Sequence, residues 1–150
     1  PRVGGFEGGT VTWAPTNITY GHNNRSAQFR LPQNRYCIEN RAADMTMNVY
    51  LAFSMTLSAA VEGIKKKIHP GKATDQDLYN MTDKEFKKLG IKRLPRNLLM
   101  ALEALKNDAL SDEVIGSVMK KSLLAYKNDE WERYHQAVTD WEVKEYLRLY

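Results

Sequence analysis

The chain has 150 residues, of which 43% are hydrophobic and 27% charged, and its formal net charge is only +4. This length suits one domain with one core, and the balanced composition suggests neither an intrinsically disordered chain nor a protein that coats a polyanion. Lysines alternate with acidic residues in stretches such as "DKEFKKLGIKR". The basic excess is therefore not gathered on one face, as it is in a dedicated nucleic-acid domain.

The cysteine content indicates the compartment. Cys37 is the single cysteine, and no cysteine and histidine cluster has zinc-binding spacing. We therefore expect no internal disulfide and a reducing, cytoplasmic location. No apolar run is long enough to span a bilayer, so no membrane segment is predicted. The chain starts at Pro1 in "PRVGGFEGG", which is typical of a processed product or a piece of a larger protein.

The first part of the chain, from Val11 to Ile38, favours strands. The stretch "TVTWAPTNITYG" alternates β-branched and aromatic residues with polar ones. In "SAQFRLP" the same alternation places Arg30 on the face opposite Phe29, toward the cavity that the sheet lines. A period of two also puts Glu39 and Arg41 of "CIENR" on one face.

Helical patterns follow. The stretch "NVYLAFSMTLSAAVEGIKKKIHPG" is rich in alanine, leucine and methionine and has almost no charge before Glu62. It predicts a helix that is buried on nearly all sides and ends at Gly63 and the lysines or at "HPG". From Thr74 onward the pattern is amphipathic, with Pro95 near the first turn of one helix and Ser111 as the N-cap of another.

The C-terminal segment "DEWERYHQAVTDWEVKEYLRLY" spaces Trp131, Tyr134, Val138 and Trp141 along one helical stripe. We interpret this stripe as a core face rather than a ligand platform. The chain contains no internal repeat and no low-complexity linker. The predicted fold class is α+β: antiparallel active-site strands, then a buried helix and amphipathic helices, in a single segment over residues 1–150.

Four arginines gather around one carboxylate, Glu39; they are Arg25, Arg30, Arg35 and Arg41. Guanidinium groups grip phosphate and carboxylate in a planar, bidentate way, and a carboxylate among them can hold a divalent cation that bridges the same phosphates. Phosphoryl transfer needs such fixed positive charge. The alternative is an ordinary set of surface ion pairs around Glu39, and spacing alone leaves both interpretations open.

Several motifs closely resemble the C-terminal catalytic stretch of the glutamine synthetase family, namely "NNRSAQFRLP", "IENRAADMTMNVYLAF" and "GIKKKIHPG". The family pattern runs N-R-S, R-I/V-P, I/V-E-x-R and D-x-x-x-N-x-Y-L, and the match is ordered and correctly spaced from Asn24 to Gly71. A weaker likeness continues in "DQDLYNMT" and in the final "WEVKEYLRLY". The resemblance implies that residues 1–150 are the C-terminal segment of such a catalytic domain, whose upstream part and N-terminal β-domain are absent.

The resemblance implies roles for five residues. Arg25 and Arg30 contact the phosphates of ATP, and Arg25 also acts catalytically on the phosphoryl group in flight. Glu39 is implied to be a ligand of Mg²⁺ or Mn²⁺. Arg41, the second implied catalytic residue, would face the γ-carboxylate of glutamate as it becomes γ-glutamyl phosphate. Arg2 is implied to grip the substrate glutamate as well.

Some positions depart from the family pattern. Cys37 stands where many members carry an arginine that helps to hold the nucleotide, and Arg35 lies upstream of that place. Val49 replaces a usual proline, while Asn48 and Tyr50 are implied to anchor the start of the apolar helix. The stretch "TWAPTNITYG" is more similar to the branch that joins glutamate to methylamine or larger amines.

The implied function is an ATP-dependent amide ligase of nitrogen metabolism, which activates glutamate as γ-glutamyl phosphate for attack by ammonia. It would work as a large ring-shaped homo-oligomer, with no nucleic acid or membrane partner. One alternative is a γ-glutamyl-amine ligase, and another is a catalytically inactive module of the same family. A third, from another class, is a basic nucleic-acid-binding domain. We expect the isolated chain to be inactive, because the family's other metal ligands lie upstream.

Three further residues each allow a functional and a structural interpretation. Tyr79 falls where some bacterial members carry an adenylylated tyrosine, although a packing role is the alternative. His69 is better interpreted as part of a helix stop than as a metal ligand, because it has no partner at ligand spacing. For Cys37 we expect a small buried residue rather than a nucleophile.

Overall fold

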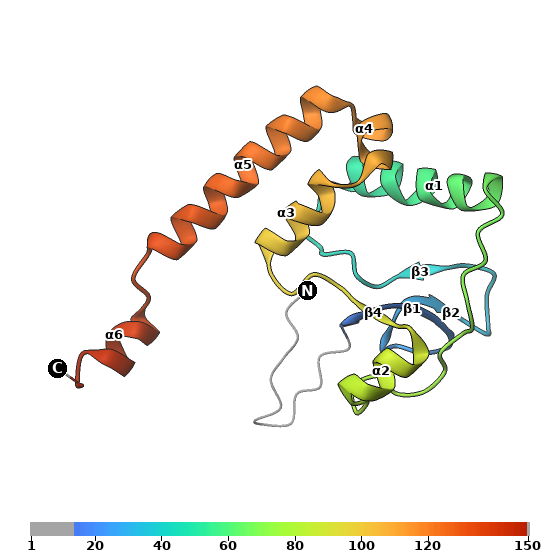
Figure 1. Cartoon of the computed structure of the whole chain (residues 1–150), viewed down its shortest axis with the longest axis horizontal. Helices are drawn as coiled ribbons and strands as arrows, with labels where there is room; N and C mark the ends of the chain where they lie inside the picture. Colours follow the sequence, from blue (N-terminus) through green and yellow to red (C-terminus); the bar gives the residue numbers. More distant parts are fainter. Residues whose placement is uncertain (1–13, 150) are drawn as a thin grey trace. The chain divides into compact units, whose positions relative to one another are not determined.

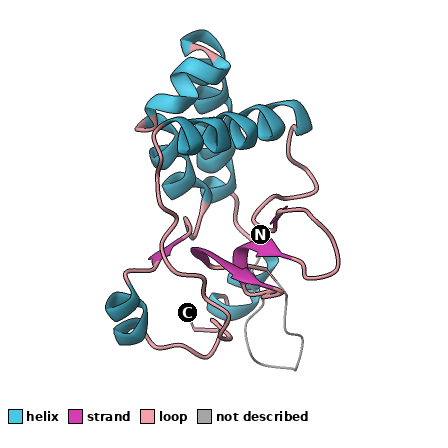
Figure 2. Ribbon diagram, turned by 90° about the vertical axis from the view of Figure 1, so that its right-hand side faces the viewer, coloured by secondary structure: helices cyan, strands magenta, loops and turns pink. Residues whose placement is uncertain are grey.

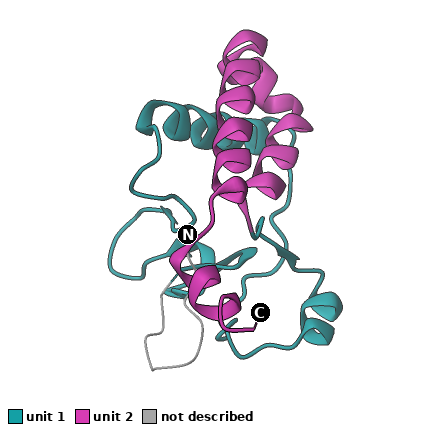
Figure 3. Cartoon of the chain, turned by 90° about the vertical axis from the view of Figure 1, so that its left-hand side faces the viewer, with its two compact units in different colours: residues 1–96 teal, residues 97–150 magenta. Residues whose placement is uncertain are grey.

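The computed structural model describes residues 14–149 of the chain. It divides into two compact units, residues 1–96 and residues 97–150 (Figure 3). The first unit contains β1 (Asn17–His22), β2 (Ala27–Leu31), β3 (Glu39–Asn40), α1 (Val49–Lys65), α2 (Asp83–Leu89) and β4 (Lys92–Arg93). The second contains α3 (Leu98–Lys106), α4 (Ala109–Ile115), α5 (Ser117–Gln136) and α6 (Asp140–Tyr146) (Figure 1). The sequence shows no linker at this division.

The strands form a small sheet in the order β3-β2-β1-β4, and helices and loops make up most of the described chain (Figure 2). The predicted α+β class is confirmed. The sheet is mixed rather than wholly antiparallel, however, because β1 and β2 run parallel while the other two pairs are antiparallel. Asn17 pairs with Ala27 and His22 with Leu31, so residues 23–26 carry the chain back along β1 before β2 begins.

The core of the first unit is small. Ala27, Leu78 and Phe86 are buried together, and Met81 and Ile91 pack against them. Leu78 belongs to a loop that follows α1 and returns to the sheet, residues 71–79. Burial of these apolar side chains fixes the loop against β2, which places polar residues of the loop beside the arginine-bearing turn.

Hydrogen bonds attach this loop to β1 as well. The Thr74 amide donates to the Tyr20 carbonyl at 2.8 Å, and the Tyr20 hydroxyl donates to the Gly71 carbonyl at 3.1 Å. Gly21 makes this close approach possible, since a Cβ atom there would lie 2.3 Å from the Thr74 carbonyl oxygen. The loop therefore lies on the strand at a distance that only glycine allows.

The helix α1 begins and ends close to the predicted residues. The Asn48 side chain caps it by accepting hydrogen bonds from the amides of Tyr50 and Leu51 at 3.0 and 3.2 Å, which confirms the anchoring role expected of Asn48. The expected burial is wrong for the described chain, because no residue of α1 is buried. Most of its large apolar side chains are exposed: Val49, Tyr50, Phe53, Leu57, Val61 and Ile64. Residues 14–149 provide no surface that covers them.

In the second unit, the N-cap of α4 differs from the prediction. Asp108, not Ser111, is the cap: its carboxylate accepts from the Ser111 amide at 2.8 Å. The buried Lys120 of α5 fixes this choice, since its Nζ donates to the Asp108 carbonyl at 2.9 Å and to the Asp112 carboxylate at 2.8 Å.

The C-terminal stripe is interrupted. α5 ends at Gln136, and Thr139 begins α6 through a capping box with Glu142. Trp141 is 62% exposed and Val138 77% exposed, so the stripe is not a core face of the described chain. None of the helices in residues 14–149 has the length and apolar character that a bilayer span requires.

Candidate active site

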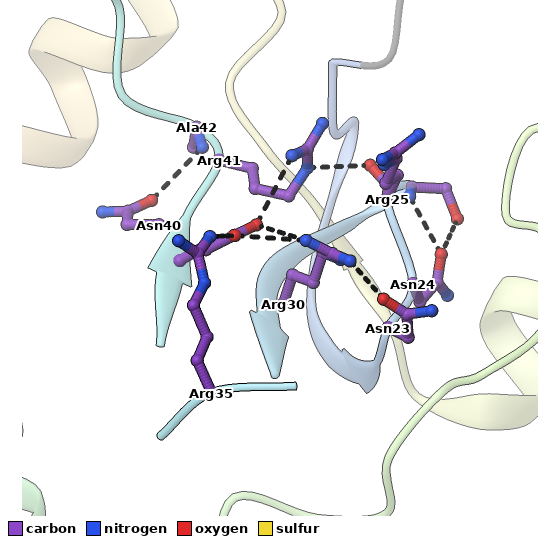
Figure 4. A network of polar contacts seen from close by, with 10 residues as sticks. Asn23, Asn24, Arg25, Arg30, Arg35, Asn40, Arg41 and Ala42 are labelled. Atoms are coloured by element: carbon purple, nitrogen blue, oxygen red, sulfur yellow. Dashed lines mark hydrogen bonds and ion pairs between the residues drawn. The ribbon is translucent and has the colours of Figure 1, made fainter. Parts of the chain in front are cut away.

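The centre of the site is a cross-strand pair. Arg30 on β2 and Glu39 on β3 are direct partners in the antiparallel register, so their side chains share a face. Arg30 Nη1 donates to both Glu39 carboxylate oxygens, at 3.1 and 3.0 Å (Figure 4). Both side chains are largely shielded, with exposures of 14% for Arg30 and 22% for Glu39.

Two more guanidinium groups approach the same carboxylate. Arg41 Nη1 lies 3.7 Å from Glu39 Oε2, and Arg35 Nη2 donates to Glu39 Oε1. Arg41 is oriented by two further bonds: its Nε donates to the Arg25 carbonyl at 3.1 Å, and its amide donates to the Gln28 carbonyl at 2.8 Å. The structure thus brings Arg30, Arg35 and Arg41 around Glu39.

The turn between β1 and β2 positions Arg25, and asparagines build this turn. Asn24 donates through Nδ2 to the carbonyls of Thr74 and Gln76 at 2.6 and 2.9 Å, and its Oδ1 accepts from the Ser26 amide at 2.9 Å. Asn23 has a positive φ of 54°, which asparagine tolerates better than most residues, and its Oδ1 accepts from Arg30 Nη2.

Sequence reasoning missed the supporting role of Asn23 and Asn24. Two adjacent asparagines before the arginine are a turn signal that could have revealed it, because asparagine side chains bond nearby backbone and adopt positive φ. The partners of Asn24 on the loop at Thr74 and Gln76 lie about fifty residues away in sequence, so no local pattern could predict them.

Electrostatics keep the central carboxylate ionised. Hydrogen bonds from Arg30 and then from Arg35 lower the pKa of Glu39 below its usual range. The Glu39 hydrogen bond in turn raises the pKa of the Arg35 guanidinium. Arg30 Nε and Gln28 Oε1 are buried without a hydrogen-bond partner among the described residues. A buried guanidinium N–H without an acceptor is costly.

A cleft of about 650 Å³ adjoins the arginines. Its lining consists of His22, Asn23, Asn24, Arg25, Ser26, Arg30, Asp75, Asp77 and Tyr79. This volume is in the range of small-molecule sites. The cleft is lined by the basic residues Arg25 and Arg30 and by acidic residues of the returning loop. A ligand that carries both an anionic group and hydrogen-bond donors would therefore be complementary to the cleft.

The fit of a divalent cation depends on Glu39. No group of three histidine, cysteine, aspartate or glutamate side chains that could hold a metal occurs in residues 14–149. Magnesium is commonly bound through one or two carboxylates together with substrate phosphates. Glu39 fits as one such anionic ligand, with phosphate oxygens, water and residues outside this chain as the others.

The structure bears differently on the four other residues that the sequence singled out. Arg2 lies outside the described residues. His69 Nδ1 accepts from the Gly71 amide at 3.1 Å, as suits a helix stop. The Tyr79 hydroxyl donates to the Ala14 carbonyl at 2.9 Å, and burial raises the pKa of Tyr79, both of which support the packing interpretation. Cys37 is exposed, so the expectation of a buried cysteine is wrong, because the β2–β3 loop that carries it stands in solvent.

Together, the sheet and its arginine cluster define an α+β protein with a cleft that two arginines line. Comparison with known families identifies it further: the family model described as "Glutamine synthetase, catalytic domain" matches residues 10–146. The chain belongs to the glutamine synthetase family, which confirms the resemblance of its motifs.

Curated relatives include the glutamine synthetase of Methanococcus maripaludis, 37% identical over 91% of this chain, and the glutamate–methylamine ligase of Methyloversatilis universalis, 38% identical over 93% of it. The chain spans only 31% of the length of each of these two relatives. A solved structure described as "Apo GmaS without ligand" superposes with a TM-score of 0.75 at 33% identity, covering 89% of this chain and 30% of that one.

Proposed function

We propose that the full-length protein containing this chain is an ATP-dependent ligase that joins glutamate to ammonia or to a small amine. The observation that carries the proposal is the cluster of Arg30, Arg35 and Arg41 around Glu39, beside a cleft that Arg25 also lines. Membership in the glutamine synthetase family supports this chemistry. Surface ion pairs alone do not account for the shielded Arg30 Nε without an acceptor.

Position and family membership support the roles that we propose for the individual residues. Arg25 and Arg30 line the cleft and bind the phosphates of ATP. Glu39 is one ligand of Mg²⁺ or Mn²⁺, which when bound would neutralise phosphate charge. Arg41, held by the Arg25 carbonyl, faces the γ-carboxylate of glutamate. Arg2, which lies outside the described residues, is proposed to bind glutamate as well.

The chemistry takes place in two steps. A γ-carboxylate oxygen of glutamate attacks the γ-phosphorus of ATP, and ADP departs. The amine nitrogen then attacks the carbonyl carbon of γ-glutamyl phosphate, phosphate leaves and the nitrogen loses a proton. In the first step negative charge shifts from the attacking carboxylate through the phosphoryl group to ADP, and in the second step it gathers on the departing phosphate. Preorganised guanidinium groups stabilise this moving charge more than they stabilise the bound substrates.

The acceptor is ammonia or a larger amine such as methylamine. The relatives include both activities at similar identity, 37% for the glutamine synthetase and 38% for the glutamate–methylamine ligase. We also propose that the whole protein forms a large ring-shaped homo-oligomer. The exposed apolar side chains of α1 support burial against further protein. The single free cysteine suits a cytoplasmic location.

The isolated 150-residue chain is proposed to be inactive on its own. Its described residues supply one carboxylate within the arginine cluster and no three-ligand metal group. A catalytically inactive family module remains the second candidate, since the chain spans less than a third of its relatives. That candidate predicts that ATP binds without turnover.

The test is phosphate release by the full-length protein with ATP, magnesium and glutamate. Ammonia, methylamine and an aromatic amine are compared as acceptors, and reactions without glutamate provide the background. Release that requires glutamate and rises with one acceptor supports the ligase and identifies its branch. No glutamate-dependent release with any acceptor would reject the ligase proposal. Oligonucleotide affinity with a steep salt dependence would favour the nucleic-acid alternative instead.

A further inference from the structure

The turn between β1 and β2, residues 23–26, presents Arg25 and is bonded to the returning loop after α1. Asn24 Nδ2 donates to the carbonyls of Thr74 and Gln76 at 2.6 and 2.9 Å. These partners lie about fifty residues away in sequence. The position of Arg25 therefore depends on a loop that carries no arginine of its own.

Asp75 of the returning loop binds the residue that comes directly before this turn. Its Oδ1 accepts from the His22 amide at 2.6 Å, and its Oδ2 lies 3.3 Å from His22 Nδ1. His22 is the last residue of β1, three positions before Arg25. The bond from the His22 amide is the main cause that lowers the pKa of Asp75 below its usual range. The carboxylate therefore stays charged near neutral pH, and the bond that it accepts is charge-assisted.

The same turn also orients a second arginine. The Arg25 carbonyl accepts from Arg41 Nε at 3.1 Å (Figure 4), and the Arg25 side chain lines the cleft beside His22 and Asp75. A shift of the turn would therefore displace the Arg25 side chain and the partner of Arg41 together. Misplacement of catalytic groups by about 1 Å can slow a reaction by about 100-fold.

From these contacts we propose that Asp75 is a positioning residue, which holds the turn through the His22 amide and thereby fixes Arg25 and Arg41 for the reaction. It acts through these two arginines rather than on a substrate. This inference rests on the proposed ligase function, and it extends that function to the loop after α1. The alternative is an exposed ion pair, with both side chains 55% exposed, that affects neither activity nor the turn.

The test is steady-state phosphate release by the full-length protein and its variants. Asp75→Ala should lower kcat by about tenfold, because misplaced catalytic groups slow the chemical step. The KM for glutamate should stay within about threefold of the wild-type value, since the loss concerns the transition state. Asp75→Asn should recover most of kcat, because its side-chain oxygen still accepts from the His22 amide. The two variants separate an acceptor for the turn from a charge that a ligand would need.

A double variant tests whether the effect passes through the turn. Groups that act as one unit are not additive, so Asp75→Ala should cost only about threefold in kcat when Arg25→Ala is already present. Asp129→Ala is the matched control. Asp129 accepts from Arg133 Nε in an exposed pair, with a side-chain exposure of 63% against 55% for Asp75. The control should leave kcat unchanged.

Amide hydrogen exchange measures the attachment of the turn without turnover. In Asp75→Ala, the peptide that spans residues 20–26 should exchange about tenfold faster at one amide, as expected for loss of one hydrogen bond to a charged group. The same peptide should exchange at about the wild-type rate in Asp75→Asn and in Asp129→Ala. This measurement also reports whether the variants are folded, since loss of the fold would raise exchange in every peptide.

The outcomes separate the two proposals. A wild type without glutamate-dependent phosphate release would overturn the proposed function and this inference together. An active wild type with an Asp75→Ala kcat within twofold would overturn the inference alone. The inference would also fall if Asp75→Asn lost as much activity as Asp75→Ala, because asparagine keeps the acceptor. An undiminished loss beside Arg25→Ala, or unchanged exchange of residues 20–26 in Asp75→Ala, would overturn it as well.

Discussion

Arg30 and Glu39 meet through a single guanidinium nitrogen, Nη1, which lies 3.1 and 3.0 Å from the two carboxylate oxygens. In a bidentate arginine–carboxylate ion pair, two parallel N–H groups donate to the two carboxylate oxygens. Here Nη2 donates to Asn23 instead, and the buried Nε has no acceptor among residues 14–149. The pair therefore leaves one N–H of Arg30 without an acceptor among these residues.

Glu39→Gln tests the role of this carboxylate as a metal ligand. The substitution keeps the shape of the side chain and removes its negative charge, so the full-length protein should lose turnover by about 100-fold or more. The Mg²⁺ concentration at half-maximal rate should rise. Glu62→Gln, which changes an exposed helical ion pair with Lys66, is the control and should leave both values unchanged. An unaltered Mg²⁺ dependence in Glu39→Gln would reject the ligand role.

Arg41→Ala tests the separation between substrate activation and nucleotide binding. Arg41 contacts Glu39 and the Arg25 carbonyl but does not line the cleft beside Arg25 and Arg30. We expect kcat to fall by about 100-fold while ATP affinity stays within a few-fold of the wild type. Steady-state kinetics and ATP binding measure the two quantities. A large loss of ATP affinity with turnover intact would show that the assigned roles are wrong.

Local periodicity predicted part of the site correctly. A period of two is a property of extended backbone, so it placed Arg30 and Glu39 on their correct faces before any pairing was known. The supporting contacts were not predictable in this way. Asn24 reaches Thr74 and Gln76, and such long-range partners depend on how the loop after α1 returns to the sheet.

The burial of α1 and the N-cap of α4 are two features that sequence composition could not predict. The apolar residues of α1 predicted a helix correctly, yet burial depends on neighbours, and residues 14–149 supply none for Phe53 or Leu57. Ser111 and Asp108 are both good N-cap residues three positions apart. The structure selects Asp108 because the distant Lys120 bonds its carbonyl and the Asp112 carboxylate.

Gly21→Ala tests the close approach of the returning loop to β1. The new Cβ would lie 2.3 Å from the Thr74 carbonyl oxygen, which is backbone and cannot move aside without the loop. We expect a destabilisation of about 1–3 kcal/mol, as is usual for overpacking, and reduced activity because Asn24 loses its partners. Thermal unfolding of the full-length protein measures the change. Gly63→Ala is the control: it lies in a helix with no atom within 4 Å of the added Cβ, so stability should not fall. Equal melting temperatures for Gly21→Ala and wild type would contradict this packing.

Acid unfolding tests the ion pairs of Glu39. The pKa of Glu39 is lowered from 4.5 in the folded protein, chiefly by hydrogen bonds from Arg30 and Arg35. A lowered folded-state pKa contributes stability that is complete above the unfolded value and is lost as the pH falls through the folded value. The stability of the wild type should therefore drop more between pH 5 and pH 3 than that of Glu39→Gln, a range of about two pH units around and below the usual carboxyl pKa. Urea unfolding at each pH gives both profiles, and parallel profiles would contradict the shift.

Asn48→Ala tests the cap of α1. Its side-chain oxygen accepts from the Tyr50 and Leu51 amides, so the alanine variant leaves two helix N–H groups without this partner. Loss of an N-cap costs about 1 kcal/mol, which should lower the urea midpoint of the full-length protein. Asn48→Asp should retain the midpoint, because aspartate caps equally well and its charge favours the helix N-terminus. The exposed Asn34→Ala is the control. If Asn48→Asp lowered the midpoint as much as alanine does, the asparagine amide nitrogen rather than the cap would be the group that matters.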